Sequence, residues 1–272
     1  MFIKRVISSL LLVPALLVVL FSPWVFFFKM VVFIALTLGL REFFNMEKFG
    51  SGERRIGYLL GCGHILFLLF YPWNGATLFL EEILLVLLVF ISTLFVHAGL
   101  QGIGKKIGLM FLAIFYIGTL GSTVGLLRDF PDGAYWVLLL LALTWLNDTS
   151  AYFFGHWFGK RRLAPLISPG KTVEGVIGGF IGSLLTFGLF HHFWDLSLSW
   201  RSGFVLVLLI SLFGPLGDLS ESLLKRSSGV KDSGVLIPGH GGILDRIDAL
   251  LFNAPVVYAF ASWIHWNSMR IE

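Results

Sequence analysis

The sequence predicts an all-α, polytopic integral membrane protein. Of its 272 residues, 57% are hydrophobic and only 13% are charged, whereas a soluble domain carries roughly 25% charged residues. The apolar residues gather into runs close to the length of about 20 residues that crosses a bilayer as a helix. A single cysteine, Cys62, excludes a disulfide framework and a cysteine-based metal cluster.

These apolar runs predict about nine transmembrane helices. We place them at 6–22, 24–40, 57–72, 79–97, 107–127, 134–154, 173–193, 202–220 and 247–267. The first follows two basic residues, as a signal peptide would, but Ser22 and Pro23 lead directly into the second span without a small-residue cleavage site. The third is the least regular, because several glycines and His64 interrupt it.

The distribution of Lys and Arg predicts the orientation of the chain. With a cytoplasmic N-terminus, 16 of the 20 Lys and Arg residues lie on the cytoplasmic side. The other four are Lys29, within the second span, and Arg128, Arg201 and Arg270 on the opposite side. Because positive charge concentrates in cytoplasmic loops, we expect a multi-pass protein of the cell inner (plasma) membrane with its N-terminus in the cytoplasm. The net charge of +4 follows from this asymmetry, and we expect no nucleic acid partner.

The two parts of the chain differ in polarity. Polar residues are denser after Gln101 than before it. We therefore predict N-terminal scaffold helices at 1–100 and a C-terminal catalytic region at 101–272. The long polar connections, 155–172 and 221–246, both fall on the predicted cytoplasmic side, and no internal repeat indicates an inverted-repeat transporter.

Three polar clusters share that side, and the first lies on the sixth span between Asn147 and Tyr152. Asp148 and Tyr152 are one helical turn apart on one face. Asn147 and Thr149 alone fit polar groups that hold helices together. An aspartate within a span usually lines a polar cavity, so we predict that Asp148 binds substrate.

The second cluster lies at the start of the seventh span. Gly170, Lys171 and Thr172 imitate the end of a phosphate-binding P-loop, but Pro165 stands where that pattern needs glycine. Two interpretations stay open. A helix N-terminus with Lys171 suits a phosphate, and Thr172 with Glu174 equally suits an ordinary helix cap.

The third cluster, residues 214–248, is the richest in charge and lies between two apolar segments. Its acidic residues are Asp218, Glu221, Asp232, Asp245 and Asp248, and its basic residues are Lys225, Arg226, Lys231 and Arg246. Such a concentration of charge costs free energy in or near a bilayer, so it indicates a functional site.

Two helix ends in this cluster carry oxygen ligands. Asp218, Ser222 and Lys225 fall on one stripe of the eighth span. Asp245 and Asp248 are three residues apart and therefore neighbours on the ninth span. Hard oxygen ligands suit Mg²⁺, which proteins hold with one or two carboxylates and substrate phosphates. We therefore predict a magnesium site at these helix ends.

The other charged residues of the cluster have separate interpretations. The basic side chains suit phosphate oxygens. Glu221 and Asp232 fit salt bridges in a solvated loop, for example between Asp232 and Lys231 or Arg226. His240 is a candidate base or ligand, but it has no partner histidine at metal-binding spacing.

The third cluster closely resembles the signature of the phosphatidate cytidylyltransferases, or CDP-diacylglycerol synthases. The matching residues are Ser222, Lys225, Arg226, Lys231, Asp232, Gly234, Ile237, Pro238, His240, Gly241, Gly242, Asp245, Arg246 and Asp248. Segments 147–152 and 168–175 resemble further blocks of the same family, so the resemblance covers at least the C-terminal half.

The resemblance implies an enzyme that makes CDP-diacylglycerol and pyrophosphate from CTP and phosphatidic acid with Mg²⁺, and K⁺ as a second candidate cation. The implied catalytic residues are Asp218, Lys225, Asp245 and Arg246. The implied substrate-binding residues are Asp148, Lys171, Ser222, Arg226, Lys231 and His240. The implied metal ligands are Asp218 and Asp245, with Asp248 as an additional or outer ligand. The lipid phosphate would attack the α-phosphorus of CTP in line.

Two alternatives carry different expectations. A CTP-dependent lipid kinase would transfer the γ-phosphate to an alcohol and would depend more on a base. A transporter of an anionic solute would place its charges near mid-membrane in repeat-related spans, whereas these gather at one face. A homodimer is also open, because Gly175 with Gly179 and Gly178 with Gly182 permit close helix packing.

Overall fold

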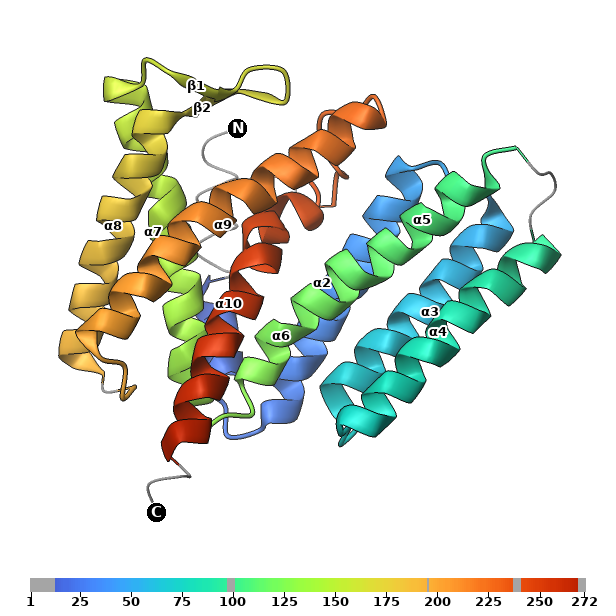
Figure 1. Cartoon of the computed structure of the whole chain (residues 1–272), viewed down its shortest axis with the longest axis horizontal. Coiled ribbons are helices and arrows are strands. Elements are labelled where there is room, and N and C mark those ends of the chain that lie inside the picture. Colours follow the sequence, from blue (N-terminus) through green and yellow to red (C-terminus); the bar gives the residue numbers. More distant parts are fainter. Residues whose placement is uncertain (1–12, 97–100, 195, 237–240, 269–272) are drawn as a thin grey trace.

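The computed structural model describes residues 13–96, 101–194, 196–236 and 241–268. It shows long helices lying side by side, with a short hairpin at one end (Figure 1). A helical segment at 13–20 comes first. The elements that follow are α2 (Val25–Met46), α3 (Ser51–Phe70), α4 (Gly75–Val96), α5 (Ile103–Ala113), the π-helix η1 (Ile114–Thr119), α6 (Leu120–Leu127), α7 (Gly133–Phe158), β1 (Arg162–Ala164), β2 (Ser168–Thr172), α8 (Val173–Phe193), α9 (Trp200–Ser227) and α10 (Leu244–Ser268).

Six stretches of the described chain are helical, long and apolar enough to cross a membrane. They are α4, the continuous helix from α5 to α6, α7, α8, α9 and α10, at the positions of the fourth to ninth predicted spans. The prediction of an all-α, multi-pass membrane protein is thus confirmed at this level. Helices α2 and α3 occupy the second and third predicted positions. They are not among the six stretches, because they carry more charged residues, such as Glu42 and Glu53. Residues 6–12 of the first predicted span lie outside the described residues, and residues 13–20 of it are helical.

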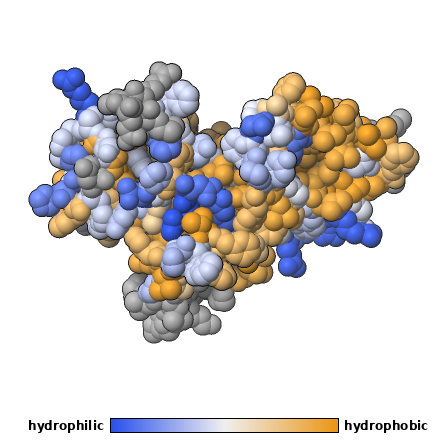
Figure 2. Space-filling view, turned by 90° about the horizontal axis from the view of Figure 1, so that it is seen from below, coloured by the Kyte–Doolittle hydropathy of each residue, from blue (hydrophilic) through white to orange (hydrophobic). Residues whose placement is uncertain are grey.

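The outer surface of α4 fits contact with lipid. Its exposed side chains are large and apolar, among them Phe79, Leu84, Leu88, Ile91 and Phe95. Figure 2 shows a largely hydrophobic surface on the side of the molecule where α3 and α4 lie. Burying such a surface in a bilayer is favourable, whereas exposing it to water is costly.

The connection between α7 and α8 departs from the predicted all-α fold. Its strands β1 and β2 form an antiparallel hairpin in which Arg162 pairs with Thr172 and Ala164 with Ser168. Helix α7 ends at Phe158 with Gly159 as its C-cap, and the backbone beyond it lacks helical partners. Pairing the two arms of the loop satisfies those groups.

Glycines allow α7 and α8 to pack with their backbones close together. A Cβ atom at Gly178 would lie 2.2 Å from Cβ of Phe154, and one at Gly182 would lie 2.0 Å from Oγ of Ser150. Both neighbours belong to α7 of the same chain. These glycines therefore serve a contact within one chain, and they offer no support for a dimer.

His64, which interrupts the third predicted span, is buried between helices. Its Nδ1 lies 2.9 Å from Oε1 of Glu81, and its Nε2 lies 2.8 Å from Oγ1 of Thr119. These contacts join α3 to α4 and to η1. The histidine thus has a structural explanation within the N-terminal helices.

Candidate active site

The three polar clusters meet at one end of the helices, at the top of Figure 1. Helix α7 ends there, β2 leads into α8, α9 makes its last turns, and α10 begins. Successive helices run in opposite directions, so the end of one lies beside the start of the next. Residues that are far apart in the sequence are therefore brought together at this end.

Lys171 joins the second cluster to the third. Its Nζ lies 2.8 Å from Oδ2 of Asp218 and 3.3 Å from the carbonyl oxygen of Pro215. The other carboxylate oxygen, Oδ1, accepts a hydrogen bond from Ser222 Oγ at 3.3 Å, as the predicted stripe on α9 requires. The side chains of Lys171 and Asp218 are 24% and 39% exposed, so a ligand can reach this ion pair.

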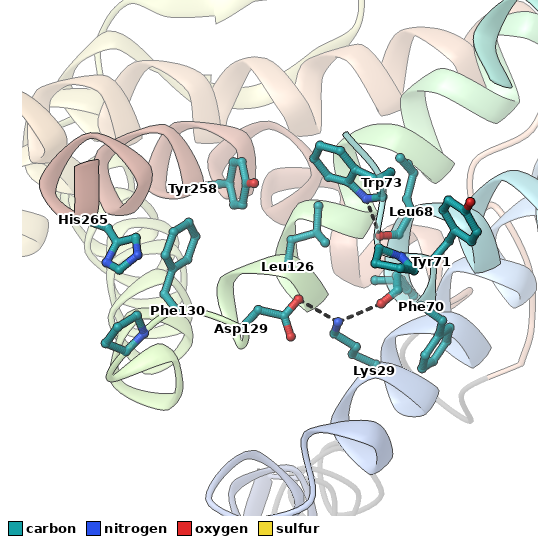
Figure 3. Close-up of a pocket in the computed structure, with 13 residues that line it drawn as sticks. Lys29, Leu68, Phe70, Tyr71, Trp73, Leu126, Asp129, Phe130, Tyr258 and His265 are labelled. Carbon is teal, nitrogen blue, oxygen red and sulfur yellow. Dashed lines mark hydrogen bonds and ion pairs between the residues drawn. The ribbon is translucent and has the colours of Figure 1, made fainter. Parts of the chain in front are cut away.

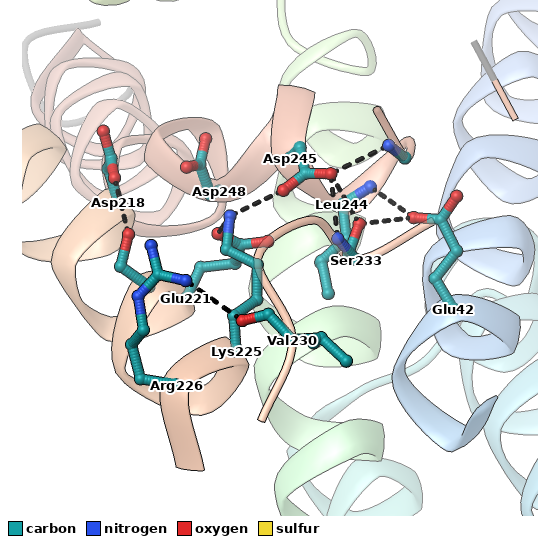
Figure 4. Close-up of polar contacts among 12 residues, drawn as sticks. Glu42, Asp218, Glu221, Lys225, Arg226, Val230, Ser233, Leu244, Asp245 and Asp248 are labelled. Carbon is teal, nitrogen blue, oxygen red and sulfur yellow. Dashed lines mark hydrogen bonds and ion pairs between the residues drawn. The ribbon is translucent and has the colours of Figure 1, made fainter. Parts of the chain in front are cut away.

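Two further carboxylates lie near this ion pair. The charges of Asp148, Asp218 and Asp248 are close enough to act on one another, and the Lys171 ammonium acts on Asp148 and Asp248. We call the three aspartates the acidic cluster. Figure 4 shows Asp218 and Asp248 pointing to the same side of α9 and α10. Three carboxyl groups beside one lysine offer hard oxygen ligands to a cation.

Lys225 is buried and pairs with carboxylates on two helices. Its Nζ donates to Oδ1 of Asp245 at 2.6 Å and also pairs with Glu221, one turn earlier on α9. The Glu221 side chain is fully buried, so its interpretation as part of a solvated loop is wrong. The reason is that α9 continues to Ser227, which makes Glu221 an interior helical residue.

Asp245 has hydrogen-bond donors at both carboxylate oxygens. Oδ1 accepts from Lys225, and Oδ2 accepts from the backbone N–H of Ser233 at 3.0 Å, from Ser233 Oγ at 3.0 Å and from the backbone N–H of Gly242 at 2.8 Å. A cation that binds Asp245 would compete with these donors. The carboxylates of Asp218 and Asp248 have fewer donors around them than that of Asp245.

The sequence reasoning missed Glu42, which α2 brings to this end of the molecule (Figure 4). Its side chain is buried and accepts hydrogen bonds from Ser233 Oγ, Ile243 N and Leu244 N, each at 2.9 Å. The available signal was a carboxylate within a largely apolar span. Its partner Ile243 follows 201 residues later, a separation that no local pattern can bridge.

The start of α8 is a capped helix. Thr172 Oγ1 accepts a hydrogen bond from the N–H of Gly175 at 3.1 Å, and Glu174 Oε2 accepts from the N–H of Lys160 at 3.0 Å. The cap interpretation is therefore confirmed. Lys171 lies just outside the cap, and its ammonium is directed to α9 instead of to the helix start.

Asn147 holds three helices together. Its amide donates to Ser183 Oγ on α8 at 3.0 Å and to Ser211 Oγ on α9 at 3.1 Å. This confirms the interpretation of Asn147 as a polar link between helices. Thr149 differs, because it is exposed and donates to the Trp145 carbonyl of its own helix.

The remaining predicted cations are exposed. Arg226 lies near the end of α9, Lys231 on the connection to α10, and Arg246 in the first turn of α10. Arg226 also donates to the carbonyl of Val230 at 3.1 Å. His240 lies outside the described residues.

The donor atoms fit a magnesium ion that shares its ligands with substrate. In the part of the chain that the structure describes, no three His, Cys, Asp or Glu side chains are grouped so as to hold a metal alone. Mg²⁺ commonly takes one or two carboxylates and completes its shell with water and phosphate oxygens. Asp218 and Asp248 can supply such carboxylates.

A separate pocket of about 500 Å³ lies towards the other end of α2, around Lys29 (Figure 3). Lys29 Nζ donates to Asp129 Oδ2 at 2.6 Å and to the carbonyl of Leu69 at 2.7 Å. Aromatic residues, including Trp73 and Tyr258, form much of the wall. None of the aspartates of the acidic cluster lines this pocket, so it is separate from the candidate active site.

Comparison with known proteins identifies the family. Residues 3–264 match the cytidylyltransferase family. A phosphatidate cytidylyltransferase of Haemophilus influenzae is 33% identical, over 93% of this chain and 96% of the relative. Those of Staphylococcus saprophyticus and Staphylococcus haemolyticus are 42% and 48% identical, over 54% and 46% of this chain and 55% and 48% of the relatives. The chain thus spans about half the length of the two staphylococcal proteins. Because the family match runs over nearly the whole chain, this protein belongs to the cytidylyltransferase family.

Proposed function

We propose that this protein is a CTP:phosphatidate cytidylyltransferase, which transfers CMP from CTP to phosphatidic acid and releases pyrophosphate. The observation that carries the proposal is the accessible ion pair between Lys171 and Asp218 beside the acidic cluster. This pair supports the proposal, because an ammonium that can bind phosphate lies beside carboxylates that can bind a metal. The relatives named phosphatidate cytidylyltransferase support the same activity.

The reaction needs positioning and charge neutralisation more than proton transfer. A phosphate oxygen of phosphatidic acid forms a bond to the α-phosphorus of CTP. The bond from that phosphorus to the bridging oxygen breaks, and pyrophosphate leaves with its electron pair. Because the lipid phosphate is already anionic at neutral pH, no strong general base is required, and His240 is not needed for that role.

The residues of the site divide into two sets by charge. Lys171, Arg226, Lys231 and Arg246 can neutralise the triphosphate or the lipid phosphate. Asp218 and Asp248 would hold Mg²⁺, with Asp148 nearby and Asp245 as a further ligand that would share its oxygens with the present donors. When bound, Mg²⁺ polarises a phosphate oxygen and stabilises the leaving group. K⁺ is a second candidate cation.

We place the active site on the cytoplasmic side of the inner membrane. The excess of Lys and Arg in the predicted cytoplasmic segments supports this side. The site also lies at helix ends, where a soluble nucleotide and the phosphate of a membrane lipid can meet.

The test uses protein purified in detergent, phosphatidic acid, Mg²⁺ and CTP labelled separately at the α- and γ-phosphates. We expect the α-label in the lipid and the γ-label in pyrophosphate. Entry of the γ-label into a lipid alcohol would instead identify a CTP-dependent lipid kinase. Transfer of neither label, with any divalent metal, would refute the proposal.

Two variants with the same chemical change complete the test. Asp218→Asn removes a charge from the acidic cluster and should abolish α-label transfer. Asp132→Asn is the control, because Asp132 is an exposed residue preceding α7 at the opposite end of that helix. Its φ of 56° is a conformation that asparagine also adopts readily. Normal activity in Asp218→Asn would refute the metal assignment.

A further inference from the structure

We infer that Glu42, on α2, is a positioning residue that holds the start of α10 in its active arrangement. The inference rests on the proposed function, because α10 carries Asp245 and Asp248. Glu42 belongs to the predicted scaffold helices at 1–100. It shares a contact network with the catalytic region and lies outside the acidic cluster itself.

Glu42 supplies partners for the backbone at the start of α10. The first N–H groups of a helix have no partner within that helix. Glu42 Oε1 accepts from Ile243 N and Oε2 accepts from Leu244 N, each at 2.9 Å. A carboxylate is favourable at this position, since a helix N-terminus carries partial positive charge. This cap comes from another helix, so it also fixes α10 against α2.

Ser233 connects Glu42 to Asp245. Its Oγ lies 2.9 Å from Glu42 Oε2 and 3.0 Å from Asp245 Oδ2. One hydroxyl carries one proton, so it can donate to only one of the two carboxylates at a time. Asp245 in turn contacts Lys225, which completes a chain of contacts from α2 through α10 to α9.

The connection between α9 and α10 is shaped around the Glu42 carboxylate. A Cβ atom at Gly234 would lie 2.6 Å from Glu42 Oε1, and one at Gly242 would lie 2.3 Å from Oε2. Any larger residue at these positions would displace the carboxylate or the loop. Both glycines thus permit the close approach on which the cap depends.

Loss of the Glu42 charge should therefore disturb the site through α10. In Glu42→Gln the side chain keeps its size, but its amide NH₂ would face N–H donors in place of one carboxylate oxygen. A displacement of about 1 Å at a reacting group can reduce turnover about 100-fold. We expect a loss of at least 10-fold in kcat, with less change in the KM for CTP, because Glu42 lies outside the acidic cluster.

The experiment combines amide hydrogen exchange with turnover on the full-length protein in detergent. Without substrate, Glu42→Gln should speed exchange at Ile243 and Leu244, a change that does not depend on the reaction. Glu53→Gln is the matched control, since Glu53 is a similarly buried carboxylate that pairs with Lys106 on α5. It should leave exchange at those two amides and the kcat unchanged.

A milder variant guards against loss of folding. Ser233→Ala removes only the shared hydroxyl, and it should reduce kcat while exchange at Ile243 and Leu244 stays slow. Wild-type turnover rates in both Glu42→Gln and Ser233→Ala would overturn the role of Glu42. Faster amide exchange in Glu42→Gln with unchanged turnover would overturn it as well. Absence of α-label transfer by the wild-type protein would instead overturn the proposed function, whatever the exchange measurements show.

Discussion

Replacing Lys225 by methionine tests whether the stability of the protein depends on the buried ion pairs that this lysine makes. Lys225 has 11% of its side chain exposed, and its partners Glu221 and Asp245 have 0% and 9%. Methionine is of similar length and uncharged. The variant leaves Glu221 buried without its cation, whereas Asp245 keeps its other donors. Removing one partner of a buried ion pair costs about 3–5 kcal/mol.

That free energy predicts the size of the change in melting temperature. A loss of about 3–5 kcal/mol corresponds to roughly 6–20 °C for a chain of this size. Replacing both members of a buried pair by apolar residues of similar volume is often neutral. The double variant Glu221→Met/Lys225→Met should therefore recover most of the lost stability. It should not recover turnover, because Asp245 still lacks the lysine.

The assay is thermal unfolding of purified protein in detergent, followed by tryptophan fluorescence, with α-label transfer measured in parallel. Lys105→Met is the control, since Lys105 is exposed on α5, and it should melt like the wild type. If Lys225→Met melts within about 2 °C of the wild type, the ion pair is not buried as described. A double variant as unstable as Lys225→Met would show that the loss does not come from Glu221.

Three further predictions concern the nucleotide, the metal and the helix packing. Lys171→Ala should raise the KM for CTP more than that for phosphatidic acid, because its ammonium is accessible beside Asp218; the opposite ranking would contradict this placement of the nucleotide. Removal of divalent metal by EDTA should stop turnover and added Mg²⁺ should restore it, so activity that persists in EDTA would exclude the metal. Gly203→Ala would bring a Cβ within 1.8 Å of Phe187 Cζ and should cost about 1–3 kcal/mol. Gly63→Ala, which meets nothing within 4 Å, should be neutral or slightly stabilising; equal melting temperatures for the two glycine variants would contradict the α8–α9 packing.

The parts of the site that lie within one helix could be predicted from the sequence. Asp218 and Ser222 are one turn apart, and the 3.6-residue period places them together on α9 whatever α9 packs against. The cap at the start of α8 is also local, since Thr172 and Gly175 are three residues apart. Even here the sequence left the role of Lys171 open, because its partner belongs to another helix.

The sequence by itself determined the class of protein and the position of most helices. Apolar runs cannot satisfy their backbone in lipid except as helices, so α4 to α10 follow from composition and length. The tertiary structure alone decided that Glu221 is buried, that Lys171 meets Asp218, and that Glu42 caps α10. These facts depend on which face of one helix packs against another. That choice depends on shape and on polar contacts between segments up to about 200 residues apart. The periodicity of residues within one segment does not reveal it.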